Sequence, residues 1–200
     1  MNQNELFGEI DIYLFDQILK NRIVPGSQIL DAGCGSGRNI VYFLRENYRV
    51  FGIDQDENSV EYCRQLAKEL APNSSPEHFQ IAPVEKIPFA DDAFDLVISN
   101  TVLHFAADET NFNEMFDEMW RVLRPKGIFF ARLASDIGLE SKVKLIAERK
   151  FLLPDGTERF LVNERMLVDK TNDVNATLLE PIKTTNVQNL RSMTTWVLRK

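Results

Sequence analysis

The feature that most restricts how this chain can fold is a set of three alternating glycines directly after a short apolar segment. Residues 28–31 are typical of a buried strand, and Gly33, Gly35 and Gly37 separate them from the amphipathic residues 38–48. Glycines between a strand and a helix allow a sharp turn and let a ligand approach the backbone, because no Cβ stands in the way. The pattern predicts a strand, a ligand-holding loop and a helix, in that order.

Strands and helices are expected to alternate over the first two thirds of the chain. Apolar segments typical of buried strands are residues 28–31, 49–54, 79–81, 94–99 and 128–133. Segments with apolar residues at helical spacing are residues 38–48, 59–70 and 110–123. Because near-continuous apolar strands alternate with helices, we predict an α/β fold that is doubly wound, with a mostly parallel sheet covered on both faces.

The last third of the chain has a different pattern. Residues 154–156, Pro-Asp-Gly between two apolar stretches, predict a hairpin turn. A helix is expected over residues 163–170. Two strands are expected over residues 178–185 and 193–199, joined by a polar loop at residues 186–192. No linker or change of composition divides the chain, so we expect one domain.

The composition is that of a water-soluble globular chain. It has 200 residues, 44% of them hydrophobic, and 23 basic against 30 acidic side chains give a formal net charge of −7. Such a chain is not expected to bind nucleic acid or an anionic membrane through bulk electrostatics, which needs a basic surface. Two cysteines and two histidines do not suffice for a disulfide framework or a structural zinc site, so no metal is expected.

The start of the sequence lacks the basic residues and the apolar run of a signal peptide. No apolar stretch is long enough for a membrane span. Together with the small number of cysteines, these observations favour a cytoplasmic protein, which we expect to be a monomer or a homodimer.

Two acidic residues frame the glycine loop and indicate the charge of its ligand. Asp54 ends the second expected strand, 17 residues beyond Gly37, where a carboxylate can accept hydrogen bonds from both hydroxyls of a ribose. Asp31 lies just before the glycines and would repel a diphosphate but suit a cation. The spacing also differs from the G-x-G-x-x-G pattern that holds a pyrophosphate. The loop therefore favours a positively charged nucleoside.

These segments resemble the class I S-adenosylmethionine-dependent methyltransferases. Residues 29–39 are similar to motif I of that family, residues 50–54 to its acidic second-strand motif, residues 82–89 and 91–100 to its adenine segment and fourth strand, and residues 121–127 to the lead-in of its fifth strand. In this lead-in, Lys126 stands where a second glycine is commoner. The tail more loosely resembles the small tellurite-resistance-type methyltransferases.

The resemblance implies a Rossmann-like methyltransferase fold with a mostly parallel, seven-stranded sheet whose last strand is antiparallel. Residues 28–133 would be the cofactor-binding core. Residues 1–27 would form a helical lid, and residues 134–200 a substrate-side insertion with a terminal strand pair. All three parts would belong to a single domain, residues 1–200, with S-adenosylmethionine as the cofactor.

The family's cofactor-binding positions carry over to this sequence one by one. Asp31, Gly33, Gly35 and Gly37 would hold the methionine part, Asp54 the ribose, Gln55 the adenine, Val84 and Glu85 the adenine border, and Asn100 and Leu103 the floor near the sulfonium. One position departs from the family pattern, because Pro83 stands where many members have an acid that reaches the adenine amine. Adenine recognition is then left to backbone groups or to Glu85.

Methyl transfer from a sulfonium is an in-line displacement on an already activated carbon, so the protein mainly has to position and desolvate the reactants. A general base is needed only if the nucleophile arrives protonated. His104, shortly after the fourth strand, is the candidate for that base. The alternative is a histidine that packs against the cofactor or fixes the backbone.

Arg132 lies near the carboxyl end of an otherwise apolar strand, where an unpaired charge is costly. Either it forms a salt bridge with an acid such as Asp136, or it faces the substrate pocket as a catalytic residue and binds an anion. Arg191 is expected on the same side, and two converging guanidinium groups would favour an anionic small-molecule acceptor. Tyr13, in the N-terminal apolar helix, would either close over cofactor or substrate or simply pack.

Other functions fit the sequence less well. A short-chain dehydrogenase needs a tyrosine with a lysine four residues later, and no tyrosine of this chain has one. A nucleic-acid amino-methyltransferase would show Asn-Pro-Pro and an aromatic residue after the fourth strand, where this chain has Ser-Asn-Thr-Val at residues 99–102. We therefore predict methyl transfer to a small molecule. A non-catalytic module that binds S-adenosylmethionine stays open as the alternative.

Overall fold

The structure is a computed structural model that describes residues 6–200. Its helices are α2 (Ile12–Leu19), α3 (Val41–Arg45), α4 (Glu57–Leu70), α5 (Glu109–Val122) and α6 (Glu164–Asp173), with 3₁₀ turns at Pro76–His78 and Leu103–Phe105. Its strands are β1 (Gln28–Ala32), β2 (Arg49–Asp54), β3 (Phe79–Ile81), β4 (Phe94–Asn100), β5 (Leu123–Ser135), β6 (Lys144–Ala147), β7 (Lys150–Leu152), β8 (Glu158–Phe160), β9 (Thr177–Leu178), β10 (Lys183–Val187) and β11 (Arg191–Arg199). Among these described helices, none is long and apolar enough to cross a membrane.

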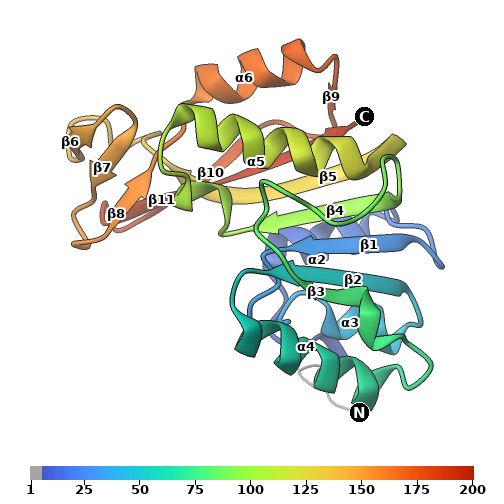
Figure 1. Ribbon diagram of the computed structural model, residues 1–200. Helices are drawn as coiled ribbons and strands as arrows, with labels where there is room; N and C mark the ends of the chain where they lie inside the picture. The colour runs from blue at the N-terminus through green and yellow to red at the C-terminus, as the bar shows by residue number, and fades with distance from the viewer. Residues whose placement is uncertain (1–5) are drawn as a thin grey trace.

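A mostly parallel sheet forms the centre of the molecule (Figure 1). Its strand order is β3-β2-β1-β4-β5-β11-β10, and the neighbouring strands from β3 to β5 run parallel. β11 is antiparallel to both β5 and β10, and the two-residue β9 pairs with β11 as an addition to these seven strands. The predicted parallel sheet with an antiparallel last strand is confirmed.

The direction of winding reverses between β1 and β4. From β1 the chain continues to β2 and β3 on one side, and then returns to β4 on the other side of β1. The loops that leave the carboxyl ends of β1 and β4 therefore diverge, which opens a crevice at this edge of the sheet. Asp31 and the glycine loop lie at this point.

Helices cover both faces of the sheet. α5 and α6 pack on one face, where the ring of Phe116 stacks on Trp196 with centroids 5.2 Å apart. α2, α3 and α4 pack on the other face, around Phe79 and Phe130. Trp196 is fully buried, and its Nε1 donates to Thr171 Oγ1 at 3.0 Å, so the polar atom of the indole is satisfied. Each such buried side chain contributes about 1.5–3 kcal/mol, and together they hold the sheet in place.

A second sheet, formed by the antiparallel strands β6, β7 and β8, extends from the carboxyl-end edge of the main sheet (Figure 1). The turn between β7 and β8 is the predicted hairpin turn at residues 154–156. The sequence pattern does not predict β6, because all four of its residues are exposed and show no alternation of burial. Leu153 and Leu161 anchor the insertion against Ala134 of β5.

The helix expected over residues 38–48 is shorter in the structure. Only α3 is regular, because the side chain of Asn39 is buried and accepts a hydrogen bond from the backbone N–H of Asp11 at 3.1 Å. The helix is followed by Asn47 in the left-handed region, with φ of +58°. A tertiary contact at one end and a left-handed residue at the other therefore set its length.

The strands near the C-terminus also have different bounds. The strand expected over residues 178–185 is divided into β9 and β10, because Pro181 lies between them and has no N–H for the ladder. The expected loop at residues 186–192 shrinks to a tight turn at residues 188–190, since β10 and β11 continue their pairing up to it. The expected helix at residues 163–170 begins one residue later, after Asn163 caps it, and runs to Asp173.

Substitution of Lys126, near the start of β5, tests whether its left-handed backbone conformation is strained. Lys126 is exposed and has φ of +68°, a conformation that costs an L-residue with a Cβ roughly 1–2 kcal/mol. After allowing for the greater freedom of glycine in the unfolded chain, we expect Lys126→Gly to raise the free energy of unfolding by about 1 kcal/mol. Lys126→Ala keeps the Cβ and should leave stability unchanged. Equal urea midpoints for the two variants would contradict this prediction.

Candidate active site

A cavity of about 330 Å³ opens at the carboxyl ends of β1, β2 and β4, and we call it the glycine-loop cavity. Its lining comes from the glycine loop, the segments after β2 and β3, the end of β4, and α5. The lining residues are Gly33, Gly35, Asp54, Gln55, Ala82, Pro83, Val84, Glu85, Asn100, Thr101, Val102, Phe105, Asn111 and Met115. Most of the residues expected to bind a cofactor therefore lie around one cavity.

The glycines of the loop are needed for two different reasons. Gly33 has φ of +81°, and a Cβ on it would lie 2.5 Å from a methyl carbon of Val102, so a side chain does not fit there. Gly35 has φ of +48° and open space around its Cα, so the backbone is accessible to a ligand. Gly37 faces away from the cavity, because a Cβ on it would meet Leu66 and Cys63 of α4 at 3.0 and 3.2 Å.

Asp54 is held at the mouth of the cavity by backbone groups. Its Oδ2 accepts a hydrogen bond from the N–H of Gly35 at 2.9 Å, and its Oδ1 accepts one from Asp56 at 3.0 Å. Each carboxylate oxygen has more than one lone pair, so both can accept a further hydrogen bond. The carboxylate is thus fixed in orientation and still able to bind a pair of ligand hydroxyls.

Asp31 is buried directly before the glycine loop and is not among the residues that line the glycine-loop cavity. It is 1% exposed, and neither carboxylate oxygen has a hydrogen-bond partner among the described residues. Burial raises its pKa to about 8, against the opposing effect of the Arg38 charge and with a further increase from Asp54. A buried carboxylate without a partner is costly, and a bound cation would remove that cost.

Leu103 lies elsewhere than expected. It is fully buried in the apolar core and does not line the glycine-loop cavity. The chain enters a 3₁₀ turn at this residue, and the turn directs Leu103 into the core while Phe105 faces the cavity. Phe105 is 64% exposed.

At the adenine end, sequence reasoning missed one residue. Asn111 of α5 lines the cavity, and its Nδ2 donates to Glu85 Oε1 at 2.9 Å. Its own Oδ1 accepts a hydrogen bond from the N–H of Ala107 at 3.0 Å, which fixes the amide. Pro83 lies in the wall without a side-chain acceptor, as expected from its chemistry. No motif in the sequence points to Asn111, because it comes from the first turn of a helix distant in the chain.

A second cavity, of about 430 Å³, adjoins the first, and we call it the arginine cavity. The two share Thr101 and Phe105 in their walls. The remaining lining residues are Asp11, Arg38, His104, Arg132, Ala134, Leu153, Asp155, Thr157, Arg159, Arg191 and Met193. The candidates His104, Arg132 and Arg191 are thus brought together, with the addition of two arginines that the sequence did not single out.

The partner of Arg132 differs from the expected one. Its Nε lies 3.2 Å from Asp11 Oδ2, whereas Asp136 pairs with Arg149 at 2.8 Å. The Nη1 of Arg132 is buried and has no hydrogen-bond partner among residues 6–200. The salt-bridge alternative therefore holds, with Asp11 in place of Asp136, and the role of Arg132 in binding an anion stays a prediction.

The ring of Tyr13 packs against the guanidinium group of Arg132. The guanidinium carbon of Arg132 lies 4.5 Å from the centroid of the Tyr13 ring, a cation–π distance. The Tyr13 hydroxyl forms a hydrogen bond with Thr185 Oγ1 at 2.7 Å. Tyr13 does not line either cavity, and its contacts correspond to the packing alternative. The expected lid at residues 1–27 lies partly outside the described residues, which begin at residue 6.

His104 is buried and has a fixed ring. Its Nδ1 accepts a hydrogen bond from the backbone N–H of Ala134 at 3.2 Å, so in the neutral ring the proton is on Nε2. Burial, with a smaller effect of the Arg159 charge, lowers the pKa of His104 to about 4. The ring is therefore neutral at neutral pH, and this geometry favours the backbone-fixing alternative over a general base.

Arg38 and Arg159 complete the charge of the arginine cavity. Arg38 follows the glycine loop, and its Nη2 donates to Asn100 Oδ1 at 3.1 Å, which links the two cavities. Arg159 of β8 lies over the ring of Phe105 with its guanidinium carbon 4.9 Å from the centroid. The side chain of Arg191 at the start of β11 is exposed. Four separate segments thus direct guanidinium groups to one place.

The wall between the cavities contains a strained residue. Thr101 has φ of +64°, which is rare for a β-branched side chain and costs roughly 1–2 kcal/mol. Its N–H donates to the carbonyl of Arg132 at 2.8 Å, and its hydroxyl donates to the carbonyl of Asn100. Hydrogen bonds to β4 and β5 therefore stabilise this strained backbone conformation. Strained residues of this kind are common at functional sites.

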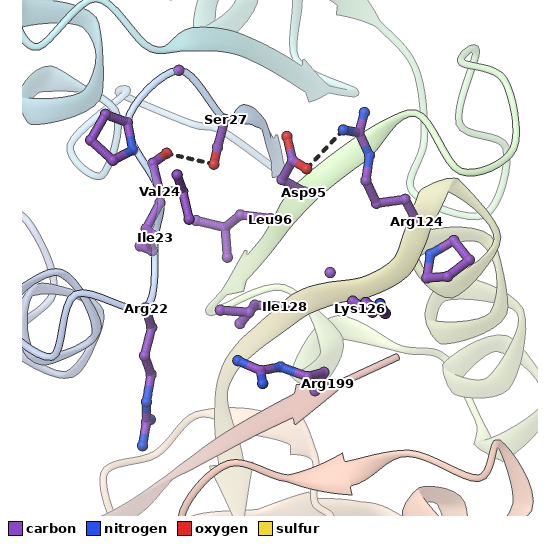
Figure 2. Close-up of a pocket in the computed structure, with 14 residues that line it drawn as sticks. Arg22, Ile23, Val24, Ser27, Asp95, Leu96, Arg124, Lys126, Ile128 and Arg199 are labelled. Carbon is purple, nitrogen blue, oxygen red and sulfur yellow. Dashed lines mark hydrogen bonds and ion pairs between the residues drawn. The ribbon is translucent and has the colours of Figure 1, made fainter.

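A further pocket, of about 460 Å³, lies at the opposite edge of the sheet (Figure 2). It is lined by the residues before β1, by the first residues of β4 and β5, and by Arg199 of β11. Figure 2 shows Arg124 paired with Asp95, at 2.7 Å, and Ser27 bonded to the carbonyl of Val24. Because ligands of open α/β sheets bind at the carboxyl ends of the strands, this pocket is not the candidate site.

The unpartnered carboxylate has a measurable effect on stability. For a carboxyl group whose folded pKa is raised, here from 3.8 to about 8, the folded state is most favoured below pH 3.8 and loses that stability as the pH rises toward 8. Asp31→Asn has no charge to bury, so its Tm without ligand should exceed that of the parent protein near pH 8, and the difference should shrink toward pH 4. Thermal unfolding at a series of pH values measures this. A Tm difference that does not change with pH would contradict it.

Comparison with known proteins agrees with this geometry. A family model described as a methyltransferase domain matches residues 30–131. The malonyl-[acyl-carrier protein] O-methyltransferase of Serratia marcescens is 30% identical over 112 residues, which are 56% of this chain and 40% of that relative. This chain thus spans about two fifths of the length of that curated relative.

Solved structures show the same fold. A SAM-dependent methyltransferase from Methanosarcina mazei has a TM-score of 0.74 at 22% identity and covers 92% of this chain and 96% of its own. The didemethyltoxoflavin methyltransferase of Burkholderia thailandensis, solved with bound 1,6-didemethyltoxoflavin and S-adenosylhomocysteine, has a TM-score of 0.70 at 21% identity over 92% and 75% of the two chains. The family match over half of the chain, together with the strand order and the glycine loop, leads to one conclusion. This chain belongs to the class I S-adenosylmethionine-dependent methyltransferases.

Proposed function

We propose that this protein transfers a methyl group from S-adenosylmethionine to a small anionic molecule by in-line displacement. The observation that carries the proposal is the pair of adjoining cavities. One has a glycine loop and two carboxylates suited to a cationic nucleoside, the other is lined by four arginines, and they share Thr101 and Phe105.

The described residues of the first cavity fit S-adenosylmethionine. Asp31 lies directly before the loop, buried and without a partner within residues 6–200, and its ionised form would favour positive charge in the cavity. Asp54 can accept hydrogen bonds from a ribose, and the open space at Gly35 lets a ligand approach the backbone. When bound, this cofactor supplies a methyl group on a positively charged sulfonium. The tasks left to the chain are to orient the acceptor and to exclude water.

The arginine cavity supports an anionic acceptor. Its four arginines against two aspartates leave a net charge of +2 on the lining. Arg132 lines this cavity and its Nη1 has no partner within residues 6–200, and charge-assisted hydrogen bonds from a guanidinium to a ligand oxygen are strong ones. A volume of about 430 Å³ suits a small molecule. The solved neighbour with bound 1,6-didemethyltoxoflavin gives independent support for a small-molecule acceptor.

Phe105 is placed to separate the reacting groups from water. It is exposed in part, it lines both cavities, and it is covered on one side by Arg159. An acceptor in the arginine cavity would meet the methyl group across the shared wall, next to this ring.

The proposed setting is the cytoplasm, supported by the small number of cysteines and the acidic net charge, with a monomer or homodimer as the assembly.

Substitution of the cavity arginines tests the proposed function. We expect Arg132→Ala and Arg191→Ala each to lower kcat/KM for an anionic acceptor by about 10- to 100-fold, because each removes a charge-assisted hydrogen bond worth about 1.5–3 kcal/mol. The Kd for S-adenosylmethionine should stay within about twofold, since neither side chain lines the glycine-loop cavity. A panel of small anions, scored by release of S-adenosylhomocysteine, provides the assay.

Arg199→Ala is the matched control, because Arg199 lies at the other end of the same strand as Arg191 and lines the opposite pocket. It should leave turnover and cofactor affinity unchanged. If no acceptor is turned over while S-adenosylmethionine still binds tightly, the proposal of an enzyme is wrong, and the non-catalytic binding module takes its place.

A further inference from the structure

We propose that the methyl acceptor is a carboxylate and that its own oxygen takes the methyl group, giving a methyl ester. This inference rests on the proposed function and goes beyond it by naming the accepting group. It follows from two properties of the arginine cavity: it holds fixed positive charge, and each proton-accepting side chain that lines it already accepts a hydrogen bond from the protein.

The histidine of the cavity is not arranged to accept a proton. Its Nδ1 is occupied by the N–H of Ala134, and its Nε2 carries the proton of the neutral ring. The Nε2–H is a donor, as needed to bind an oxygen that already bears negative charge. An alcohol or an ammonium group would instead need an acceptor at this place to remove its proton.

The two carboxylates of the cavity are also engaged. Asp11 Oδ1 accepts from the N–H of Tyr13 at 2.9 Å, and Oδ2 pairs with Arg132. Asp155 Oδ1 accepts from both the N–H and the hydroxyl of Thr157, at 3.0 and 2.6 Å. Although burial opposes them, these bonds and the nearby arginines lower the pKa of Asp155, which makes it a weak base. With His104, these are the proton-accepting groups among the described residues that line this cavity.

Positive charge in the cavity is permanent. A guanidinium does not lose its proton in proteins, so Arg38, Arg132, Arg159 and Arg191 keep their charge at any physiological pH. The buried Nη1 of Arg132 has no partner among residues 6–200, and a planar carboxylate matches the geometry of such a donor. One carboxylate oxygen can be held by the guanidinium while the other is directed toward the shared wall.

Among oxygen acceptors, a carboxylate is one that needs no base. With an ordinary pKa of about 4, a carboxylic acid is ionised at neutral pH, whereas a phenol or an alcohol is not. In the proposed step a lone pair of the carboxylate oxygen forms a bond to the methyl carbon. The bond from that carbon to sulfur breaks, and its electron pair stays on sulfur. The products are a methyl ester and S-adenosylhomocysteine, the two opposite charges cancel, and no proton is released.

The alkali lability of the product tests this inference without knowledge of the individual acceptor. The protein is incubated with S-adenosylmethionine labelled with tritium in the methyl group and with the small-molecule fraction of a cell extract. Mild alkali then hydrolyses methyl esters to volatile methanol, whereas methyl ethers, methylamines and thioethers are stable. We expect most of the transferred label to become volatile, and Arg191→Ala to reduce the volatile label at least tenfold while Arg199→Ala does not.

The outcomes separate the two levels of the proposal. Transferred label that stays in alkali-stable products overturns the carboxylate inference and leaves methyl transfer to a small molecule standing. No transferred label at all, with cofactor binding intact, overturns the proposed function itself and the inference with it. Release of one proton per turnover, followed with a pH indicator, would also contradict carboxylate methylation.

A binding measurement provides a readout that does not depend on turnover. Benzoate, benzyl alcohol and benzylamine have the same ring and differ in the group that would be methylated. With S-adenosylhomocysteine present, calorimetry should show benzoate binding at least tenfold more tightly than the other two. Arg191→Ala should remove that preference, and Arg199→Ala should keep it. Binding of the alcohol or the amine as tightly as benzoate would overturn the inference.

Discussion

The burial of a single carboxylate at the carboxyl end of β1 is the physical constraint on which the site depends. Asp31 lies where β1 and β4 separate, and within residues 6–200 no group satisfies its oxygens. The free energy cost of an ion there is offset either by protonation or by a ligand that brings positive charge. The glycine loop and Asp54 lie beside Asp31: Gly35 leaves the protein backbone open to a ligand, and its N–H fixes the Asp54 carboxylate at the mouth of the cavity.

The arginine cavity is organised by charge pairing and by contacts between segments that are distant in the sequence. Arg132 comes from the central strand β5, yet Asp11 and Tyr13 of the N-terminal segment fix its position through an ion pair and a cation–π contact. Within the described residues, the N-terminal segment therefore fixes the position of Arg132. His104 has an analogous role, because its ring is fixed by a backbone N–H of β5 and presents a donor to the cavity.

The sheet and the glycine loop could be predicted from the sequence because local chemistry determines them: apolar runs specify buried strands, and the glycines specify the turn. The arginine cavity could be predicted only in part. In the sequence, Arg38 and Arg159 have the pattern of ordinary surface charges. They line one cavity only because the fold brings β8 and the end of the glycine loop together. Asp136 is near Arg132 in sequence, but the partner in space is Asp11. Which nitrogen of His104 is occupied depends on a tertiary contact that no sequence pattern reveals.

The small sheet β6–β8 has an evolutionary consequence. It lies outside residues 28–133, is anchored to β5 by a few apolar side chains, and supplies Arg159 together with Asp155 and Thr157 of its hairpin turn. Under the proposed function, replacement or lengthening of this hairpin would change which molecule is recognised, and the residues that line the glycine-loop cavity would stay the same. Substrate choice in such a chain can thus diversify through replacement of this one small sheet.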